Sequence, residues 1–267
     1  MTGRSIMAEV NRERVLLVGG QRALVMQLAH PLVAAGVDQH SDFPARALGR
    51  LRRTLDLSLA MIYGSPDEAD AAVRAVRTIH DRVEGQAGGD VYRANDPELL
   101  QWVNATLVDT TLLVFERFVR RLSTRERARY YAESVDAAEL FGIPRGAIPP
   151  DLRSFRRYLR RMLTDGPLRA TDAGRRLVRD VLRPPLPIPL RFPAVASRRI
   201  TVSLLPEEIR QMFGLRHRPA DDVVVAAAAK TSRALLPAVP PVIREFARAR
   251  AGSGQYGDGR ARAPREG

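Results

Sequence analysis

The sequence predicts an all-α fold, and three observations support this prediction. Apolar residues recur at spacings of three and four along almost the whole chain, whereas the alternation that is typical of strands is scarce. Two segments repeat one helix-start pattern, in which a capping residue precedes proline and acidic residues. Finally, 45% of the 267 residues are hydrophobic, so the chain can bury a substantial core.

Glycines and prolines divide the N-terminal part into three predicted helices. Gly19-Gly20 ends the first helix, and Pro31 kinks or restarts the chain after the second. The third helix is capped at Ser41-Asp42 and stops at Gly64. These helices are predicted over residues 8–18, 21–30 and 41–64.

The next two helices have the clearest start signals. Ser65 can cap a helix that begins with Pro66 and ends at Gly85. Asn95-Asp96 precedes a proline in the same way, and the segment that follows is apolar on most sides, which predicts a helix through the centre of the fold. The two predicted helices cover residues 65–85 and 95–122.

The C-terminal half combines helices with one proline-rich stretch. Further helices are predicted over residues 123–141, 150–163, 206–215 and 221–250. Residues 183–193, RPPLPIPLRFP, contain too much proline for a helix and are predicted to be extended. Residues 1–250 are predicted to form one domain, followed by a disordered tail over 251–267, which has almost nothing to bury.

Composition narrows the class of protein. The chain has no cysteine, which excludes disulfides, thiolate metal sites and a cysteine nucleophile. The longest aliphatic run, residues 223–229, is far short of the ~20 residues that cross a bilayer. No signal-peptide core is present near the N-terminus. We therefore expect a soluble, cytoplasmic protein that is at most peripheral to a membrane.

The net charge of +13 is concentrated in one region. Residues 143–219 contain 17 basic and 6 acidic side chains, and the basic ones are all arginine. Such a region can bind nucleic acid, anionic lipid or an acidic ligand. Because no nucleic-acid-binding motif accompanies it, we expect no nucleic-acid partner. A merely solvated face and a peripheral contact with an anionic membrane both remain open.

One histidine lies on an apolar helical stripe. Val73, Val76, His80 and Val83 follow each other at spacings of three, four and three, so they share one face of the predicted helix. A buried imidazole is either a core side chain that is hydrogen-bonded to a neighbour or a ligand of a transition metal. The spacing alone leaves both interpretations open.

The preceding helix has two faces whose residues are not those of a typical solvent-facing surface. Its core face is made of Leu48, Leu51, Leu55, Leu59 and Ile62. The other face groups two arginines and a threonine with large apolar residues: Arg50, Arg53, Thr54, Leu57 and Met61. This combination suits an anionic, partly apolar ligand such as haem, whose propionates pair with guanidinium groups. Alternatively, the arginines are surface residues paired with carboxylates.

Five segments together resemble one known family. In chain order they are HPLVAAGVDQHSDF (30–43), RLRRT (50–54), IHDRVEG (79–85), YRANDPELLQWVNATLVDT (92–110) and LLPEEIRQMFGL (204–215). Each is weak alone, but in this order they are similar to the MpaB-type oxygenase and rubber-oxygenase (latex-clearing protein) family. The resemblance implies a globin-like bundle of roughly eight or more helices around a haem b pocket. It also implies an enzyme that uses O2 or peroxide.

The resemblance implies roles for several residues of these two helices. His80 would be the proximal ligand of the haem iron, with His40 as the alternative ligand. Arg50 and Thr54 would occupy the distal positions. Arg53 matches a lysine that serves latex-clearing proteins as sixth ligand. Arginine stays protonated and is a poor ligand, so the distal side would stay open.

The central helix supplies the remaining candidates. Leu107 and Thr111 are predicted to line the pocket together with Leu57 and Met61. Asn104 stands where the family usually has histidine, a change that either alters activity or preserves only a hydrogen bond. Asp109 can orient His80 or act as a base, but a structural hydrogen bond is the simpler role.

The sequence thus predicts a haem-dependent oxygenase that acts on a hydrophobic organic molecule, with oxidative cleavage of isoprenoid C=C bonds as the reaction that the family implies. The alternative is a helical protein that binds haem or a hydrophobic ligand without catalysis. A di-iron site is disfavoured, because no Glu-x-x-His pair is present. The substrate and the oligomeric state are not predicted.

Overall fold

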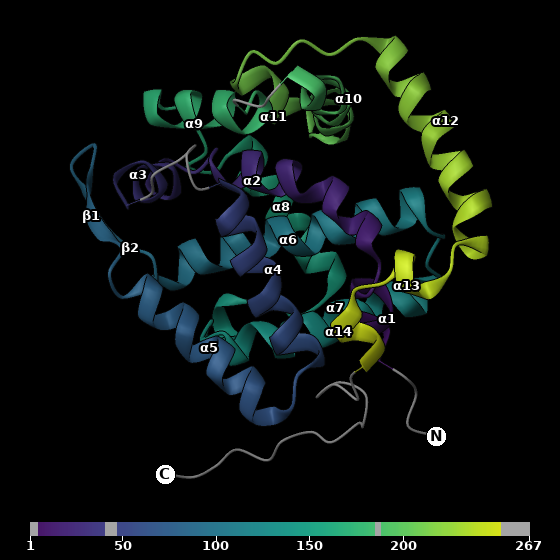
Figure 1. Cartoon of the computed structure of the whole chain (residues 1–267). Coiled ribbons are helices and arrows are strands. Elements are labelled where there is room, and N and C mark those ends of the chain that lie inside the picture. Colours follow the sequence, from purple (N-terminus) through teal and green to yellow (C-terminus); the bar gives the residue numbers. More distant parts are fainter. Residues whose placement is uncertain (1–4, 41–46, 185–187, 252–267) are drawn as a thin grey trace.

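The computed structural model describes residues 5–40, 47–184 and 188–251; the side chains of residues 47–53 and 188–193 are outside this description. Helices dominate these residues, which confirms the all-α prediction (Figure 1). They are α1 (Ile6–Asn11), α2 (Gly20–Gln27), α3 (Pro31–His40), α4 (Ala47–Tyr63), α5 (Pro66–His80), α6 (Pro97–Phe118), α7 (Thr124–Leu140), α8 (Leu152–Thr164), α9 (Asp172–Leu182), α10 (Ile188–Leu204), α11 (Glu207–Met212), α12 (Pro219–Leu235), α13 (Pro241–Arg244) and α14 (Ala247–Ala251). Three short 3-10 helices accompany them: η1 (Arg14–Gly19), η2 (Arg145–Ala147) and η3 (Leu236–Ala238).

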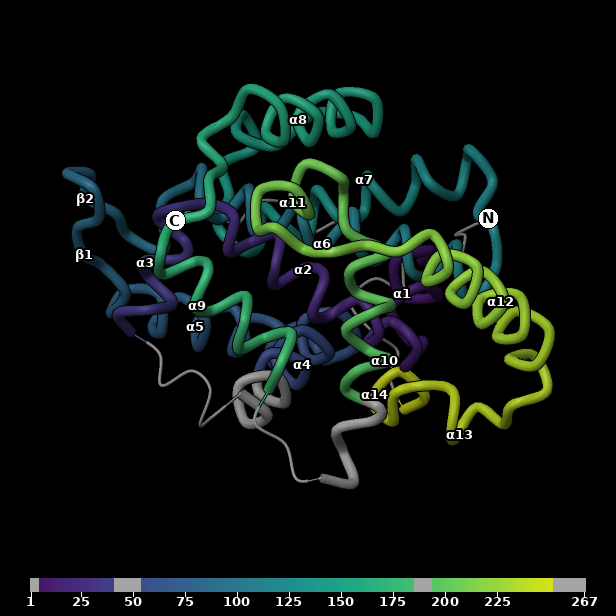
Figure 2. The backbone as a smooth tube through the Cα atoms, turned by 90° about the horizontal axis from the view of Figure 1, so that it is seen from above, coloured from purple at the N-terminus to yellow at the C-terminus, as the bar shows by residue number. Residues whose placement is uncertain are grey.

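Helix α6 crosses the middle of the molecule, as its apolar sequence predicts. Trp102, Ala105 and Phe115 are fully buried, and α2, η1, α7 and α12 pack around the helix. Seen from above, α8 lies on one side of α6 and α4 on the other (Figure 2). The two faces of the molecule that α4 and α8 form are therefore far apart.

Capping bonds confirm the predicted starts of α5 and α7, whereas Asp96 occupies the N-cap of α6 without a side-chain capping bond. Ser65 accepts a hydrogen bond from the Glu68 backbone N–H, and the Glu68 carboxylate accepts one from the Ser65 N–H. Ser123 and Glu126 form the same capping box before α7. These reciprocal bonds satisfy donors that a helix start otherwise leaves unpaired. The predicted cap at Ser41-Asp42 lies outside the described residues.

The predicted helix over residues 8–18 is wrong, because the chain breaks into α1 and η1. At the break, Glu13 has an extended backbone and is almost completely buried. Its carboxylate accepts three hydrogen bonds from the Arg244 guanidinium, at 2.6–3.0 Å. Residues more than 200 positions apart thus decide where this helix stops. Local helix propensity could not have predicted the contact between Glu13 and Arg244.

The helix predicted over 65–85 ends early, at His80. The chain then forms an antiparallel hairpin of β1 (Glu84–Ala87) and β2 (Asp90–Arg93), in which Gly85 pairs with the buried Tyr92. Gly88 and Gly89 form its tip with φ of 63° and 92°, a conformation that glycine adopts at no steric cost. No strand was predicted here, because the hairpin is too short for a clear alternation.

Two C-terminal predictions are also corrected. The proline-rich stretch over 183–193 is not extended throughout, since α10 already begins at Ile188. Pro189 lies in the first turn of α10, where the missing N–H costs no hydrogen bond. The helix predicted over 221–250 is interrupted between α12 and α14, because Pro237 and Pro240 cannot continue it. Helix α9 was not predicted at all.

The single-domain prediction stays a prediction, and residues 252–267 of the predicted tail lie outside the described residues. No helix in the described parts of the chain is long and apolar enough to span a membrane.

Candidate functional site

His80 occupies the last turn of α5, directly before the hairpin. The predicted stripe is confirmed, because Val73, Val76 and His80 are half-buried while Arg74 and Arg77 between them are exposed. Ala69 and Ala72 complete the buried side of the helix. The amphipathic pattern therefore orients the imidazole toward the protein and not toward bulk solvent.

A pocket of about 260 Å³ adjoins the imidazole. Side chains from α5, the hairpin and the loop before α6 line it: His80, Asp81, Val83, Glu84, Arg93 and Asn95. Burial lowers the pKa of His80, while a hydrogen bond with Asn95 and the charge of Asp81 raise it less. The ring is therefore neutral at pH 7, and one of its nitrogens has a free lone pair.

Asn95 links the imidazole to a carboxylate. Its Nδ2 donates to Oδ1 of Asp81 at 2.6 Å, which leaves the Asn95 Oδ1 to accept from the ring N–H of His80. Such a partner fixes both the tautomer and the orientation of an imidazole. Sequence reasoning missed this role, since Asn95 was interpreted only as a possible helix cap.

Helix α4 packs mainly against α5 and crosses in front of α6 (Figure 1). Thr54 is exposed, and Leu57 and Met61 are half-buried. The side chains of Arg50 and Arg53 lie outside the described part of the chain. By helical spacing, positions 50 and 53 share one face of α4 with Thr54, Leu57 and Met61.

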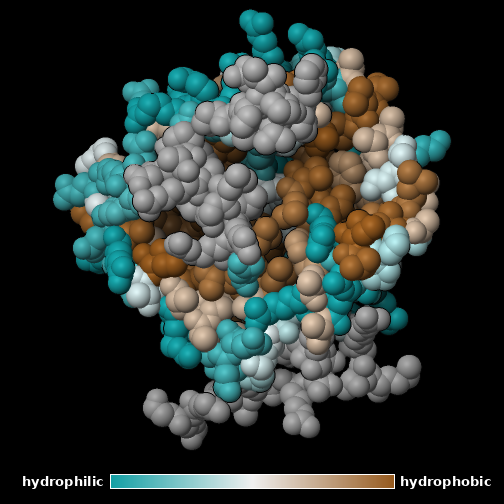
Figure 3. Space-filling model, viewed as in Figure 1, coloured by the Kyte–Doolittle hydropathy of each residue, from teal (hydrophilic) through white to brown (hydrophobic). Residues whose placement is uncertain are grey.

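The candidates on α6 share a face that is incompletely covered. Asn104 and Thr111 are half-buried, and Leu107 is 46% exposed although α6 is the central helix. Thr111 also hydrogen-bonds the Tyr130 hydroxyl of α7. Apolar side chains are visible at the centre of the face of the molecule that Figure 3 shows. Leu107 thus leaves part of the central helix open to solvent.

Asp109 lies on the opposite side of α6 from these candidates. Its carboxylate accepts from Nη2 of Arg22 at 2.7 Å, and Arg22 also donates to the Thr110 hydroxyl and to the Leu204 carbonyl. The structural role considered for Asp109 thus matches its surroundings. Arg22, a buried arginine on α2, was not singled out by the sequence.

His40, the alternative ligand, ends α3 and is exposed. Its Nε2 lies 2.9 Å from the Glu84 carbonyl oxygen, so it hydrogen-bonds the first strand of the hairpin. Next to it, Gln39 accepts from the Tyr92 hydroxyl at 2.6 Å. The end of α3 therefore fixes the hairpin that borders the His80 pocket.

Five side chains have buried polar atoms without a hydrogen-bond partner among the described residues; three are Arg12, Trp102 and Ser203, and the other two are a glutamine and a histidine. One is Gln101 on α6, through both atoms of its amide, and the other is His30 through Nδ1. Burial and the charge of Arg169 lower the pKa of His30 to about 4. For Gln101, the only signal in the sequence was that a glutamine stands within an apolar helix.

His30 should make the fold sensitive to acid. The unfolded chain protonates this imidazole near pH 6.5, whereas the folded chain does so only near pH 4. The contribution of His30 to the free energy of unfolding is therefore complete above pH 6.5 and is lost as the pH falls toward 4. Between pH 7 and about pH 4.5 the free energy of unfolding should fall by roughly 2–3 kcal/mol from this group. Urea unfolding at both pH values measures it, and His30→Asn should show the smaller pH dependence; an equal slope in the variant would contradict the assignment.

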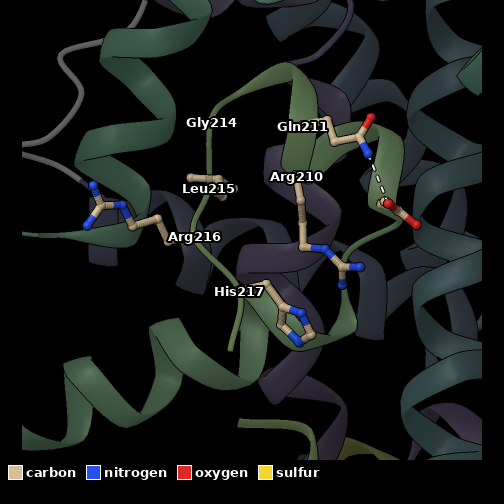
Figure 4. Close-up of a pocket in the computed structure, with 7 residues that line it drawn as sticks. Arg210, Gln211, Gly214, Leu215, Arg216 and His217 are labelled. Atoms are coloured by element: carbon tan, nitrogen blue, oxygen red, sulfur yellow. Dashed lines mark hydrogen bonds between the residues drawn. The ribbon is translucent and has the colours of Figure 1, made fainter. Parts of the chain in front are cut away.

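The last family-like segment forms α11 and a second pocket of about 360 Å³ (Figure 4). It shares no residue with the pocket of His80. Nη1 of Arg210 donates to the Leu205 carbonyl at 3.0 Å, and His217 Nε2 lies 2.9 Å from the Asp222 carboxylate. These groups thus hold the chain between α10 and α12. We do not place the candidate site there.

The basic segment forms an arginine-rich face on α8. Five exposed arginines follow its outer side: Arg153, Arg156, Arg157, Arg160 and Arg161. None of them forms a salt bridge with another described residue. The face lies on the side of α6 away from α4 (Figure 2), so it does not border the candidate site.

The comparison with known proteins assigns the chain to a family. In the described parts of the chain, no three His, Asp or Glu side chains are grouped so that they could hold a metal ion. A search of curated proteins and a search of solved structures found no match. The family model "ER-bound oxygenase mpaB/B'/Rubber oxygenase, catalytic domain" matches residues 8–234, which include α5, α6 and both pockets. The chain therefore belongs to the family of mpaB-type and rubber-oxygenase catalytic domains.

Proposed function

We propose that this protein is a haem b-dependent oxygenase that oxidises a hydrophobic organic molecule with O2 or peroxide. The observation that carries the proposal is the neutral, half-buried imidazole of His80 on an apolar helix face in an oxygenase-family chain. A single imidazole without other protein ligands suits a metal whose remaining ligands come from a macrocycle.

The candidate residues of α4, α5 and α6 suit a haem group by their chemistry. His80 would supply the axial nitrogen, with Asn95 holding the opposite N–H. Leu57, Met61 and the exposed Leu107 offer apolar contacts to the flat ring. Arg50 would pair with a propionate, as guanidinium groups do with carboxylates. Bound haem supplies the redox chemistry by which O2 or peroxide is activated.

The polar residues of α4 would then act on the oxidant. Arg50 and Arg53 keep their charge at any physiological pH, so their N–H groups would stabilise negative charge that develops as oxygen is reduced. The Thr54 hydroxyl would add a donor that can also accept a proton. Arg53 would leave the distal side open, because a protonated guanidinium has no lone pair for a metal.

The substrate class follows from the apolar candidates on α4 and α6. The side chains offered by Leu57, Met61 and Leu107 are apolar, and Thr111 presents a methyl group as well as its hydroxyl. A greasy molecule such as an isoprenoid-like chain would bind there by the hydrophobic effect. Oxidative cleavage of its C=C bonds is the reaction that family membership favours.

Purified protein supplied with haem during expression tests the proposal. We expect a Soret band near roughly 400 nm, typical of a histidine-ligated haem, and O2 consumption that depends on an added alkene of isoprenoid type. Protein that folds but takes up no haem would refute the proposal. Peroxide in place of O2 distinguishes the two oxidants.

One observation favours a second candidate function, that of a non-catalytic carrier of haem or a hydrophobic ligand. Asn104 on α6 is half-buried at the position of the family histidine, and an amide cannot take up a proton near neutral pH. A carrier would bind haem and leave the alkene unchanged. If the protein is a carrier, Asn104→His should introduce oxidation of the alkene. If the wild type is already an enzyme, the same substitution should change its rate only moderately.

Asn95 should be required for tight haem binding. Replacing it with leucine removes the acceptor for the ring N–H of His80 and leaves the imidazole free to rotate. Loss of such an outer partner lowers metal affinity by roughly 10- to 100-fold. Haem titration of apoprotein measures the change, and Asn95→Asp, which retains an acceptor, should keep most of the affinity. Equal affinity of the leucine variant and the wild type would remove Asn95 from this role.

A further inference from the structure

Helix α12 presents an apolar face to solvent. Val225 and Ala229 are buried against α10 and α6, and the Ser232 hydroxyl donates to the Phe118 carbonyl at 2.7 Å. These contacts fix which side of α12 points outward. With 100° per residue, the exposed side contains Lys230 and, next to it, an apolar part that we call the outward side: Val223, Val224, Ala227, Ala228, Thr231, Ala234 and Leu235.

This outward side contains no charged residue over more than three turns. Val223 is 70% exposed, Val224 64% and Leu235 61%, although helix surfaces of this kind are normally polar. Val242 and Ile243 on α13, which follows α12 after η3, are similarly exposed. The apolar surface is visible as brown side chains along the right side of Figure 3, where Figure 1 places α12. A contiguous exposed apolar surface usually marks an interaction site.

The charges around the apolar surface are positive. Lys230 and Arg233 are exposed along one edge of α12, and neither forms a salt bridge with another described residue. Arg216 and Arg218 are exposed just before the helix. Three acidic groups nearby lie within 4 Å of an arginine: Asp221 of Arg199, Glu245 of Arg12 and Glu13 of Arg244. The Asp222 carboxylate is hydrogen-bonded to His217 at 2.9 Å.

We propose that the outward face of α12, continued by α13, docks the protein on anionic phospholipid membranes. Apolar side chains flanked by unpaired cations are the chemistry that inserts into the boundary of headgroups and acyl chains. A second copy of this chain fits less well, because it would bring its own cations against Lys230 and Arg233. The arginine face of α8 lacks exposed large apolar residues among those described and lies elsewhere on the molecule.

Vesicle co-sedimentation tests the proposal without haem or substrate, so it can fail while the proposed function stands. The wild type should bind vesicles of phosphatidylglycerol and phosphatidylcholine, and should bind pure phosphatidylcholine weakly. Val223→Glu/Val224→Glu should weaken binding to the anionic vesicles by roughly tenfold or more, because it replaces inserted apolar surface with repelled charge. Both residues are exposed, so the variant should fold like the wild type; circular dichroism verifies this.

Val91→Glu is the matched control. Val91 is 62% exposed on β2, which lies on the opposite side of the molecule from α12 in Figure 1, so this variant should bind like the wild type. Unchanged binding of the α12 variant would overturn the proposal, as would a loss of binding confined to Arg156→Ser/Arg160→Ser on α8. Sedimentation velocity gives the third contrary outcome: a wild-type dimer that the α12 variant dissociates, together with no vesicle binding, would assign the face to a second copy.

Discussion

Replacing His80 with alanine is expected to abolish stable haem binding. In the proposed site the imidazole of His80 would supply the ligand nitrogen from α5, and its half-buried, neutral state means that no proton competes for its lone pair near pH 7. Loss of a direct ligand should exceed the roughly 10- to 100-fold effect of losing an outer partner. Haem content per chain and the position of the Soret band measure the result.

Two variants sharpen this test. His40→Ala should keep its haem, because His40 is exposed and hydrogen-bonded to the Glu84 carbonyl. His80→Gly leaves a space in which added imidazole can take the place of the missing side chain, and we expect imidazole to restore the wild-type spectrum. Full haem occupancy with an unchanged spectrum in His80→Ala would remove His80 from the ligand role, and His40 would then be the next candidate.

Replacing Arg22 with methionine is expected to give the largest loss of stability among the substitutions considered. Arg22 is 3% exposed and binds Asp109, Thr110 and the Leu204 carbonyl, so one guanidinium joins α2, α6 and the end of α10. Removing one partner of a buried ion pair typically costs 3–5 kcal/mol, because the remaining charge stays unpaired. We expect about 3 kcal/mol, the lower end of that range, because the Asp109 carboxylate is partly exposed to water.

Asp109→Asn is the control for this prediction. Its side-chain oxygen still accepts from Arg22, but the buried guanidinium loses its counter-charge, so we expect a loss of about 2 kcal/mol. This loss is smaller than for Arg22→Met, because the bonds of Arg22 to Thr110 and to the Leu204 carbonyl remain. Urea unfolding measures both variants. Equal losses for the two would mean that the charge of Asp109, and not the linking of three helices, accounts for the effect.

Much of the helical framework follows from the sequence because its causes are local. The capping boxes of α5 and α7 involve residues three positions apart, and the stripe with Val73, Val76 and His80 repeats within one helix. The burial of α6 likewise follows from its apolar composition. Such interactions are formed within a few residues, so a single sequence is enough to identify them.

The candidate site was predictable in part for the same reason. Helical periodicity groups the candidates of α4, α5 and α6 on one face of each helix. It does not reveal that Asn95, beyond a hairpin, reaches both His80 and Asp81. The burial of Gln101 and Arg22 without local partners is equally invisible, since their surroundings come from other helices.

The sequence by itself determined the helical class, the helix starts, the orientation of His80 and the family, because each depends on short-range patterns. Only the tertiary structure decided where the chain breaks at Glu13, that a hairpin follows His80, and that the outward face of α12 remains uncovered. Those features are set by contacts between distant segments. The free energy of such contacts depends on which surfaces meet, and no local pattern specifies that.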